Sequence, residues 1–282
     1  MSAPPPSRVL GPSPERAIAD SSDWEPWLAP AAFLSGLAAA VIGGGILGGV
    51  AAASGADPKH PPPIVGILTA LILELSFVGA ALLFARSRGR LAPHLFGFSR
   101  TRVASALGWL VLAAVLYFAF SQAWASKLHL HEPDKLPTQL GADRSTLALV
   151  IAAFVLCVTA PIAEELFFRG FFFSALRNWR GPWLATVLTG VAFGAVHLGG
   201  TPVGFLVPLA FFGMALCVLR WVTGSLYPCF ALHAINNSIA LGLLRHWSPA
   251  QIALLALGAL TLIAVITGPF ARRAPAPLAV PA

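Results

Sequence analysis

The stretch TLALVIAAFVLCVTAPIAEELFFRGFFF, residues 146–173, decides how this chain must fold. Residues 146–163 carry no charged side chain, and about 20 apolar residues suffice to cross the hydrocarbon core of a bilayer. Glu164, Glu165 and Arg169 then follow within the same run. Because a backbone in lipid must satisfy its hydrogen bonds within its own segment, the stretch predicts a transmembrane helix that carries charged residues. The helical stretch from Thr146 to Asn178 is too long for one perpendicular crossing, and we expect Pro161 to kink it.

The whole chain has the same apolar character. Of its 282 residues, 57% are hydrophobic and 10% are charged, whereas soluble domains carry about 25% charged residues. The mean hydropathy is +0.79. This composition excludes a soluble globular protein, a disordered chain and a nucleic-acid-binding domain, so we interpret the net charge of +7 as a sign of membrane topology.

Apolar runs of transmembrane length recur between short polar or Pro/Gly-rich breaks. They predict an all-α polytopic membrane protein with about eight transmembrane helices. The predicted spans are Leu28–Ala53, Ile64–Ala85, Val103–Ala125, Thr146–Phe173, Trp183–Leu198, Val203–Val222, Ser225–Leu244 and Ala250–Phe270.

The spans divide the chain into four predicted parts. Residues 1–27, which are rich in Pro and Ser, form a disordered N-terminal tail. Residues 28–145 contain three transmembrane helices with their loops. Residues 146–244 form the core that holds the polar motifs, and residues 245–282 contain the last transmembrane helix and a C-terminal tail.

The basic residues predict the orientation of these spans. With the N-terminus inside the cell, twelve of the 18 Lys and Arg residues lie on the cytoplasmic side and Arg169 lies within a span. The remaining five, on the opposite side, are Lys59, Lys127, Lys135, Arg144 and Arg245. By the positive-inside rule, both termini are cytoplasmic. We expect an integral protein of the plasma membrane, and the abundance of Ala, Gly and Pro favours a bacterial source.

Charged residues within the spans are candidate functional residues, because each costs at least about 2.5 kcal/mol near the bilayer centre. Glu165 and Arg169 are four residues apart and share a helix face as an ion pair. Glu164 has no basic residue three or four positions away, which makes it the candidate general base. The alternative is that both glutamates share Arg169 in a network that only holds helices together.

Other polar side chains fall within neighbouring apolar spans. His197 is surrounded by small residues that allow another helix to approach closely, and His233 and Asn237 lie one turn apart on one helix face. Each could instead be a hydrogen-bonded link between helices. We interpret Glu74, which lies between two leucines in the second span, as a structural partner of a buried polar group.

Together the motifs resemble those of the CAAX prenyl protease and bacteriocin-processing family of intramembrane proteases, also called the Abi family. The matching motifs are Glu164-Glu165-x-x-x-Arg169, Phe193-x-x-x-His197 and His233-x-x-x-Asn237. The resemblance covers the chain from about Thr146 to Leu244. One such motif is weakly specific, but three in this order on successive apolar spans are highly specific.

The resemblance implies a membrane endopeptidase that acts on a peptide or protein substrate at the bilayer. By this resemblance, Glu164 with the help of His197 activates a water molecule that attacks a peptide carbonyl. His233 and Asn237 donate hydrogen bonds to the oxyanion that forms, which is effective in a site poor in water. Glu165 and Arg169 hold the helix in place.

Members of the family are commonly called metalloproteases, so zinc is a cofactor to consider. Glu164, His197 and His233 could supply three ligands and leave a fourth position open. The sequence lacks the His-Glu-x-x-His helix that combines two zinc ligands with a base. Spacing leaves metal-dependent and metal-free mechanisms open, and we favour the metal-free one.

Two other functions compete with the protease. A non-enzymatic immunity or scaffold protein of the same fold would use the polar cluster only to hold helices together. A proton-coupled transporter would use the intramembrane Glu and His residues as a proton relay. The chain has neither the repeated halves nor the paired broken helices that are typical of transporters.

Overall fold

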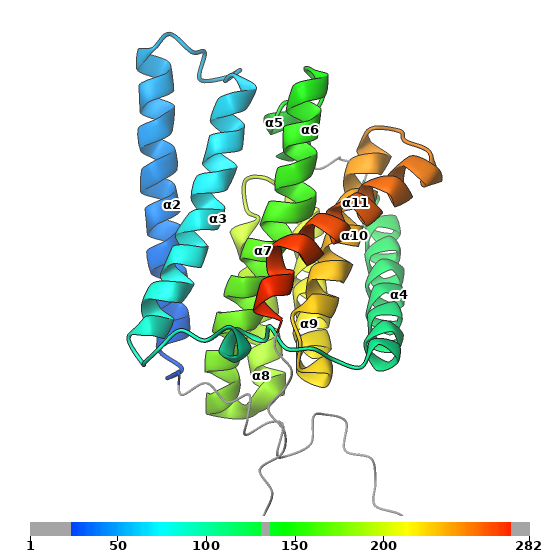
Figure 1. The fold of residues 1–282 in the computed structure, drawn as a ribbon. Helices are drawn as coiled ribbons and strands as arrows, with labels where there is room; N and C mark the ends of the chain where they lie inside the picture. Colours follow the sequence, from blue (N-terminus) through cyan, green and yellow to red (C-terminus); the bar gives the residue numbers. More distant parts are fainter. Residues whose placement is uncertain (1–23, 131–135, 272–282) are drawn as a thin grey trace, which may run out of the picture.

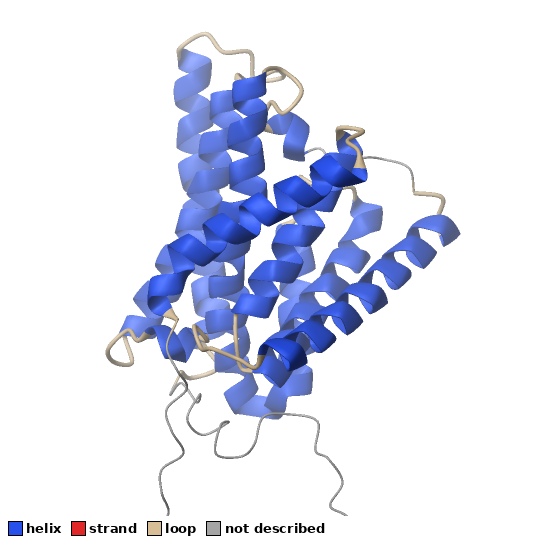
Figure 2. Ribbon diagram, turned by 45° about the vertical axis from the view of Figure 1, so that its right-hand side comes forward, coloured by secondary structure: helices blue, strands red, loops and turns tan. Residues whose placement is uncertain are grey.

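The computed structural model describes residues 24–130 and 136–271, and these residues form a bundle of helices without a β-strand (Figures 1 and 2). This confirms the prediction of an all-α polytopic membrane protein. The helices of the N-terminal half are α2 (Leu28–Ala53), α3 (Pro63–Arg86), η1 (Pro93–Phe96), α4 (Val103–Lys127) and α5 (Leu136–Gln139). Of these, α2, α3 and α4 coincide closely with the first three predicted spans.

One long helical segment, interrupted at Arg180 and Gly181, carries the first two polar motifs. It consists of α6 (Thr146–Phe154), η2 (Val155–Thr159), α7 (Ala160–Glu164), η3 (Glu165–Phe172) and α8 (Phe173–Val196). Both η2 and η3 are π-helical. The turn η2 lies just before Pro161, and helical residues continue through the proline within α7. The segment reverses only at Gly181, whose φ of 81° is favoured by glycine.

The rest of the core folds back along this segment. It comprises η4 (Val203–Phe205), α9 (Leu206–Thr223), α10 (Tyr227–Leu244), α11 (Pro249–Thr267) and η5 (Gly268–Phe270). In Figures 1 and 2, α11 crosses the other helices at a slant. Its first turn is closed by a capping box between Ser248 and Gln251.

All eight predicted spans are helical, and six helical segments of the described chain are long and apolar enough to cross a membrane. The fourth and fifth spans merge into the single segment Thr146–Val196. The helix α10 falls outside the six because His233, Asn236 and Asn237 reduce its hydropathy. The polar motif therefore lowers the mean hydropathy of α10 below that of the six segments.

The two ends of the described chain lie at the same end of the bundle (Figure 1). Residues 1–23 of the predicted tail lie outside the described residues, as do Arg272 and Arg273. Trp24, the first described residue, is buried between Phe96 and Phe171, with ring centroids 4.9 and 5.0 Å away. The start of α2 is thus anchored to the bundle.

Glycines bring α8 and α9 into close contact next to the site. A Cβ atom on Gly190 would lie 2.7 Å from the carbonyl oxygen of Ala210, and one on Gly194 would lie 2.8 Å from that of Leu206. Close approach through small residues is a common way for membrane helices to pack, because lipid provides little hydrophobic force between them. This contact sets the position of the C-terminal end of α8, where His197 follows.

Candidate active site

A buried charged cluster joins the middle of the long helical segment to α10. Oε1 of Glu165 accepts hydrogen bonds from Nη1 of Arg169 and from Nδ1 of His233, both at 2.8 Å. Glu165 and Arg169 are fully buried, and His233 is 3% exposed. Because an unpaired charge costs several kcal/mol in such surroundings, the carboxylate and guanidinium depend on each other. The predicted pair of Glu165 and Arg169 is therefore present, and His233 extends it to a second helix.

Arg169 also fixes the position of α9. Its Nη2 atom donates a hydrogen bond of 3.1 Å to the carbonyl oxygen of Gly213, and its guanidinium carbon lies 4.4 Å from the ring centroid of Phe193. A flat cation can hydrogen-bond at its edge and stack on an aromatic ring at its face. Arg169 thus links three helical elements around the cluster.

Glu164 lies beside the other nitrogen of His233. Its Oε2 atom is 3.8 Å from Nε2 of His233, which is too long for a direct hydrogen bond. The side chain of Glu164 is 16% exposed, whereas that of Glu165 is fully buried. The imidazole of His233 therefore stands between two adjacent glutamates, of which Glu164 is the more accessible.

Glu74 reaches the same cluster from α3. It is 6% exposed, and its carboxyl group lies close to that of Glu164. The buried polar group that we expected Glu74 to contact is thus the candidate general base. The sequence signal for this residue was its position within an apolar span, but nothing in the sequence indicated its partner.

His197 lies beside the cluster, at the residue that follows α8. His197 Nδ1 is 2.8 Å from the carbonyl oxygen of Phe193, and the rings of His197 and His233 flank Phe193 with centroid distances of 4.9 and 5.9 Å. Among residues 24–130 and 136–271, no hydrogen bond or ion pair joins His197 to Glu164.

Asn237 binds the long helical segment. Its Nδ2 atom donates a hydrogen bond of 2.8 Å to the carbonyl oxygen of Leu156, which lies in the π-helical turn η2. Its Oδ1 atom accepts a hydrogen bond of 3.2 Å from Asn236. The second amide hydrogen of Asn237 Nδ2 is available for another acceptor.

The residues that we considered as zinc ligands do not form a metal-binding group in this structure. Within the described part of the chain, no three His, Cys, Asp or Glu side chains lie together in a way that could hold a metal ion. The geometry therefore does not fit zinc bound by Glu164, His197 and His233.

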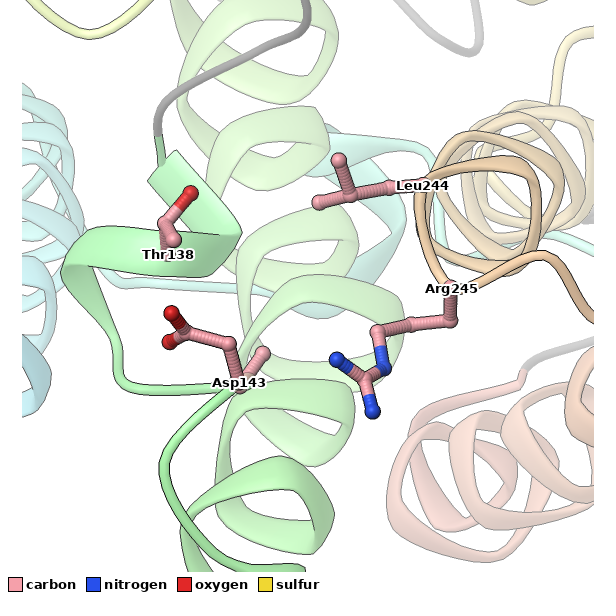
Figure 3. Close-up of a pocket in the computed structure, with 5 residues that line it drawn as sticks. Thr138, Asp143, Leu244 and Arg245 are labelled. Atoms are coloured by element: carbon pink, nitrogen blue, oxygen red, sulfur yellow. The ribbon is translucent and has the colours of Figure 1, made fainter.

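A small cavity lies apart from the cluster, at the C-terminal end of α10 (Figure 3). It has a volume of about 120 Å³ and is lined by Thr138, Ala142, Asp143, Leu244 and Arg245. None of the predicted site residues lines it. The cavity and the charged cluster are thus separate features.

The helices and the buried cluster define a polytopic membrane protein with an ionisable site inside its bundle. Residues 146–239 match the family described as "Type II CAAX prenyl endopeptidase Rce1-like". This match supports the resemblance of residues 146–239 to the CAAX prenyl protease and bacteriocin-processing family that the motifs predicted, and it supports a CAAX-type intramembrane protease in general. No curated protein and no solved structure matches the chain.

Proposed function

We propose that this protein is an intramembrane endopeptidase in which Glu164 activates water for hydrolysis of a peptide bond near the membrane surface. The observation that carries the proposal is the placement of His233 between Glu165 and Glu164. A buried imidazole fixed by one carboxylate and facing a second, more accessible one is suited to acid–base chemistry.

The reaction requires one proton to move from water to the leaving group. The carboxylate of Glu164 takes a proton from water while the oxygen attacks the carbonyl carbon. The C–N bond of the resulting tetrahedral intermediate then breaks, and the proton passes to the amine. The products are a new carboxyl terminus and a new amino terminus. His197, on the neighbouring helix, assists in orienting the water.

His233 and Asn237 are the proposed donors to the oxyanion. If Nδ1–H of His233 donates to Glu165, a donor role for Nε2 requires that both ring nitrogens carry hydrogen. The carboxylate of Glu165 holds the imidazole ring in place, and Arg169 holds that carboxylate. Asn237 contributes the amide hydrogen that is not used by Leu156.

The proposed mechanism does not include zinc, because the candidate ligands form no three-ligand group among residues 24–130 and 136–271. Metal analysis of the purified protein, together with activity after chelation, tests this part of the mechanism. One bound equivalent of zinc that activity requires would overturn it.

The proposed substrate is a peptide or protein segment at the surface of the lipid bilayer. We place the protein in a bacterial plasma membrane with both termini in the cytoplasm, because the basic residues favour that side. The family description points to prenylated C-terminal peptides, so prenylated and unmodified peptides should be compared directly.

Cleavage of a quenched fluorescent peptide library by the purified full-length protein tests the function. The parent is compared with Glu164→Gln and His233→Ala, each checked for thermal stability, and with Thr69→Val on the exposed face of α3 as a control. We expect cleavage by the parent and the control, and a loss of at least about 100-fold in the two variants. Equal cleavage by parent and Glu164→Gln, or none by the parent with any peptide, would contradict the proposal.

A further inference from the structure

An apolar groove lies at the end of the bundle where α2 begins and where α8 reverses direction at Gly181 (Figure 1). Its volume is about 470 Å³, which is within the range of roughly 300–1,000 Å³ that is typical of ligand sites. Residues at the start of α2, in η3 and in both halves of α8 line the groove, and none of these described residues is charged. The candidate site residues do not line it, so the groove is separate from the charged cluster.

Two tryptophans line the groove from different helical elements. Trp27, directly before α2, is 55% exposed, and Trp179, in the first half of α8, is 51% exposed. Tryptophan is enriched where the hydrocarbon core of a bilayer meets the headgroups, because its ring is apolar and its N–H group is polar. The two rings therefore place the groove at headgroup level, and Leu176 and Leu188 in its lining can contact a hydrocarbon chain.

Arginine side chains lie beside both tryptophans. The guanidinium carbon of Arg180 is 5.2 Å from the ring centroid of Trp179. On the side of α2, Glu25 accepts a hydrogen bond from Nε1 of Trp27 and forms an ion pair with Arg88. Within the described part of the chain, Arg180 takes part in no ion pair. The rim of the groove, defined as Glu25, Arg88 and Arg180, thus has a net positive charge.

We propose that the groove binds an anionic phospholipid, with an acyl chain along the apolar lining and the phosphate at Arg180 and Arg88. An apolar groove with a basic rim at a bilayer surface matches both parts of such a molecule. A zwitterionic phospholipid brings its own positive charge to the rim, and the isoprenoid chain of a prenylated peptide brings no phosphate. The charges therefore favour an anionic phospholipid over both. The site does not depend on the proposed peptidase chemistry.

Native mass spectrometry of the full-length protein in detergent tests the site, with phosphatidylglycerol and phosphatidylcholine of identical chains as probes. We expect the parent to bind one phosphatidylglycerol with a Kd at least about fivefold below that for phosphatidylcholine, since each arginine near the surface contributes about this factor. Arg180→Gln should raise the Kd for phosphatidylglycerol by about fivefold. The matched control Arg102→Gln, at an exposed arginine directly before α4, should leave it within about twofold of the parent.

A second pair of variants separates the groove from the surrounding lipid. Leu188→Trp adds bulk inside the groove, whereas Val187→Trp adds it at the adjacent position, which does not line the groove. We expect Leu188→Trp to weaken the binding of both lipids by at least about fivefold, because the added ring occupies the space of the chain. Val187→Trp should bind both lipids as the parent does. Leu188 and Val187 are both exposed, so neither variant should prevent folding, which thermal unfolding without added lipid checks.

Equal affinity of the parent for the two lipids, or equal binding by Leu188→Trp and Val187→Trp, would overturn the inference. So would a farnesylated peptide that displaces phosphatidylglycerol with an affinity unaffected by Arg180→Gln, because the groove would then hold the lipid chain of a substrate. If lipid binding behaves as expected but the parent cleaves no peptide, the lipid site stands and the proposed protease function fails.

Discussion

The imidazole of His233 is hydrogen-bonded through Nδ1 to the buried carboxylate of Glu165, at 2.8 Å. The same carboxylate oxygen holds Arg169, so one atom links the ionic cluster of the long helical segment to α10. As a result, the orientation of the His233 imidazole depends on Glu165, whose side chain is fully buried. The first two predictions follow from this dependence.

Replacement of Glu165 by Gln should destabilise the protein by about 3 kcal/mol, because it leaves the buried Arg169 guanidinium without a counter-charge. Peptidase activity should fall with it, because His233 loses its charged partner. Thermal unfolding in detergent and peptide cleavage measure the two effects. The matched control is Glu25→Gln, which breaks the exposed ion pair with Arg88 and should change stability by less than about 1 kcal/mol. A Glu165→Gln variant as stable as Glu25→Gln would contradict the prediction.

The double variant Glu165→Leu/Arg169→Met should separate stability from activity. Replacing a complete buried ion pair by apolar residues is often neutral for stability, so the double variant should unfold closer to the parent than Glu165→Gln does. It should nevertheless remain inactive, because no carboxylate orients His233. Unfolding curves and cleavage assays on the same preparation check this, and recovery of activity in the double variant would count against the role of Glu165.

Replacement of Asn237 by Ala should affect both stability and catalysis. Loss of its hydrogen bond to Leu156 should cost about 1 kcal/mol, in the range for polar contacts between membrane helices. If Asn237 also donates to the oxyanion, kcat should fall by about 100-fold or more with little change in KM. A variant with reduced thermal stability but parental kcat would assign Asn237 to helix linkage alone.

Replacement of Gly194 by Ala should destabilise the contact between α8 and α9. The added Cβ would lie 2.8 Å from the carbonyl oxygen of Leu206, and overpacking of this kind costs about 1–3 kcal/mol. Gly79→Ala is the matched control, since nothing lies within 4 Å of a Cβ at that helical position. The control should be neutral or stabilising by up to about 1 kcal/mol. Equal unfolding temperatures for the two variants would contradict this explanation of the packing.

Some features of this protein can be predicted from the sequence because they are local. Apolar runs of transmembrane length predict the helices, since a backbone in lipid has few other ways to satisfy its hydrogen bonds. The spacing of Glu165 and Arg169 predicts their pairing, since residues four apart share a helix face. The family motifs likewise depend only on residue types and their order.

Local patterns also have limits in this chain. A π-helical turn precedes Pro161, and the sequence did not predict it, because such a turn depends on the packing around it. Arg220, which the sequence places with the cytoplasmic basic residues, is 1% exposed beneath Gly97 at the end of α9. The positive charge of Arg220 does not indicate from the sequence that its side chain is buried.

The contacts that assemble the site were decided by tertiary structure. His233 meets Glu165 across 68 residues of sequence, and Asn237 meets Leu156 across 81. Glu74 of α3 lies close to Glu164, and Phe77 on the same helix packs against Phe167 of η3. Helix periodicity specifies which side chains share a face, but it does not specify which helix that face will meet. That choice depends on the packing of glycines, aromatic rings and ion pairs from the whole bundle.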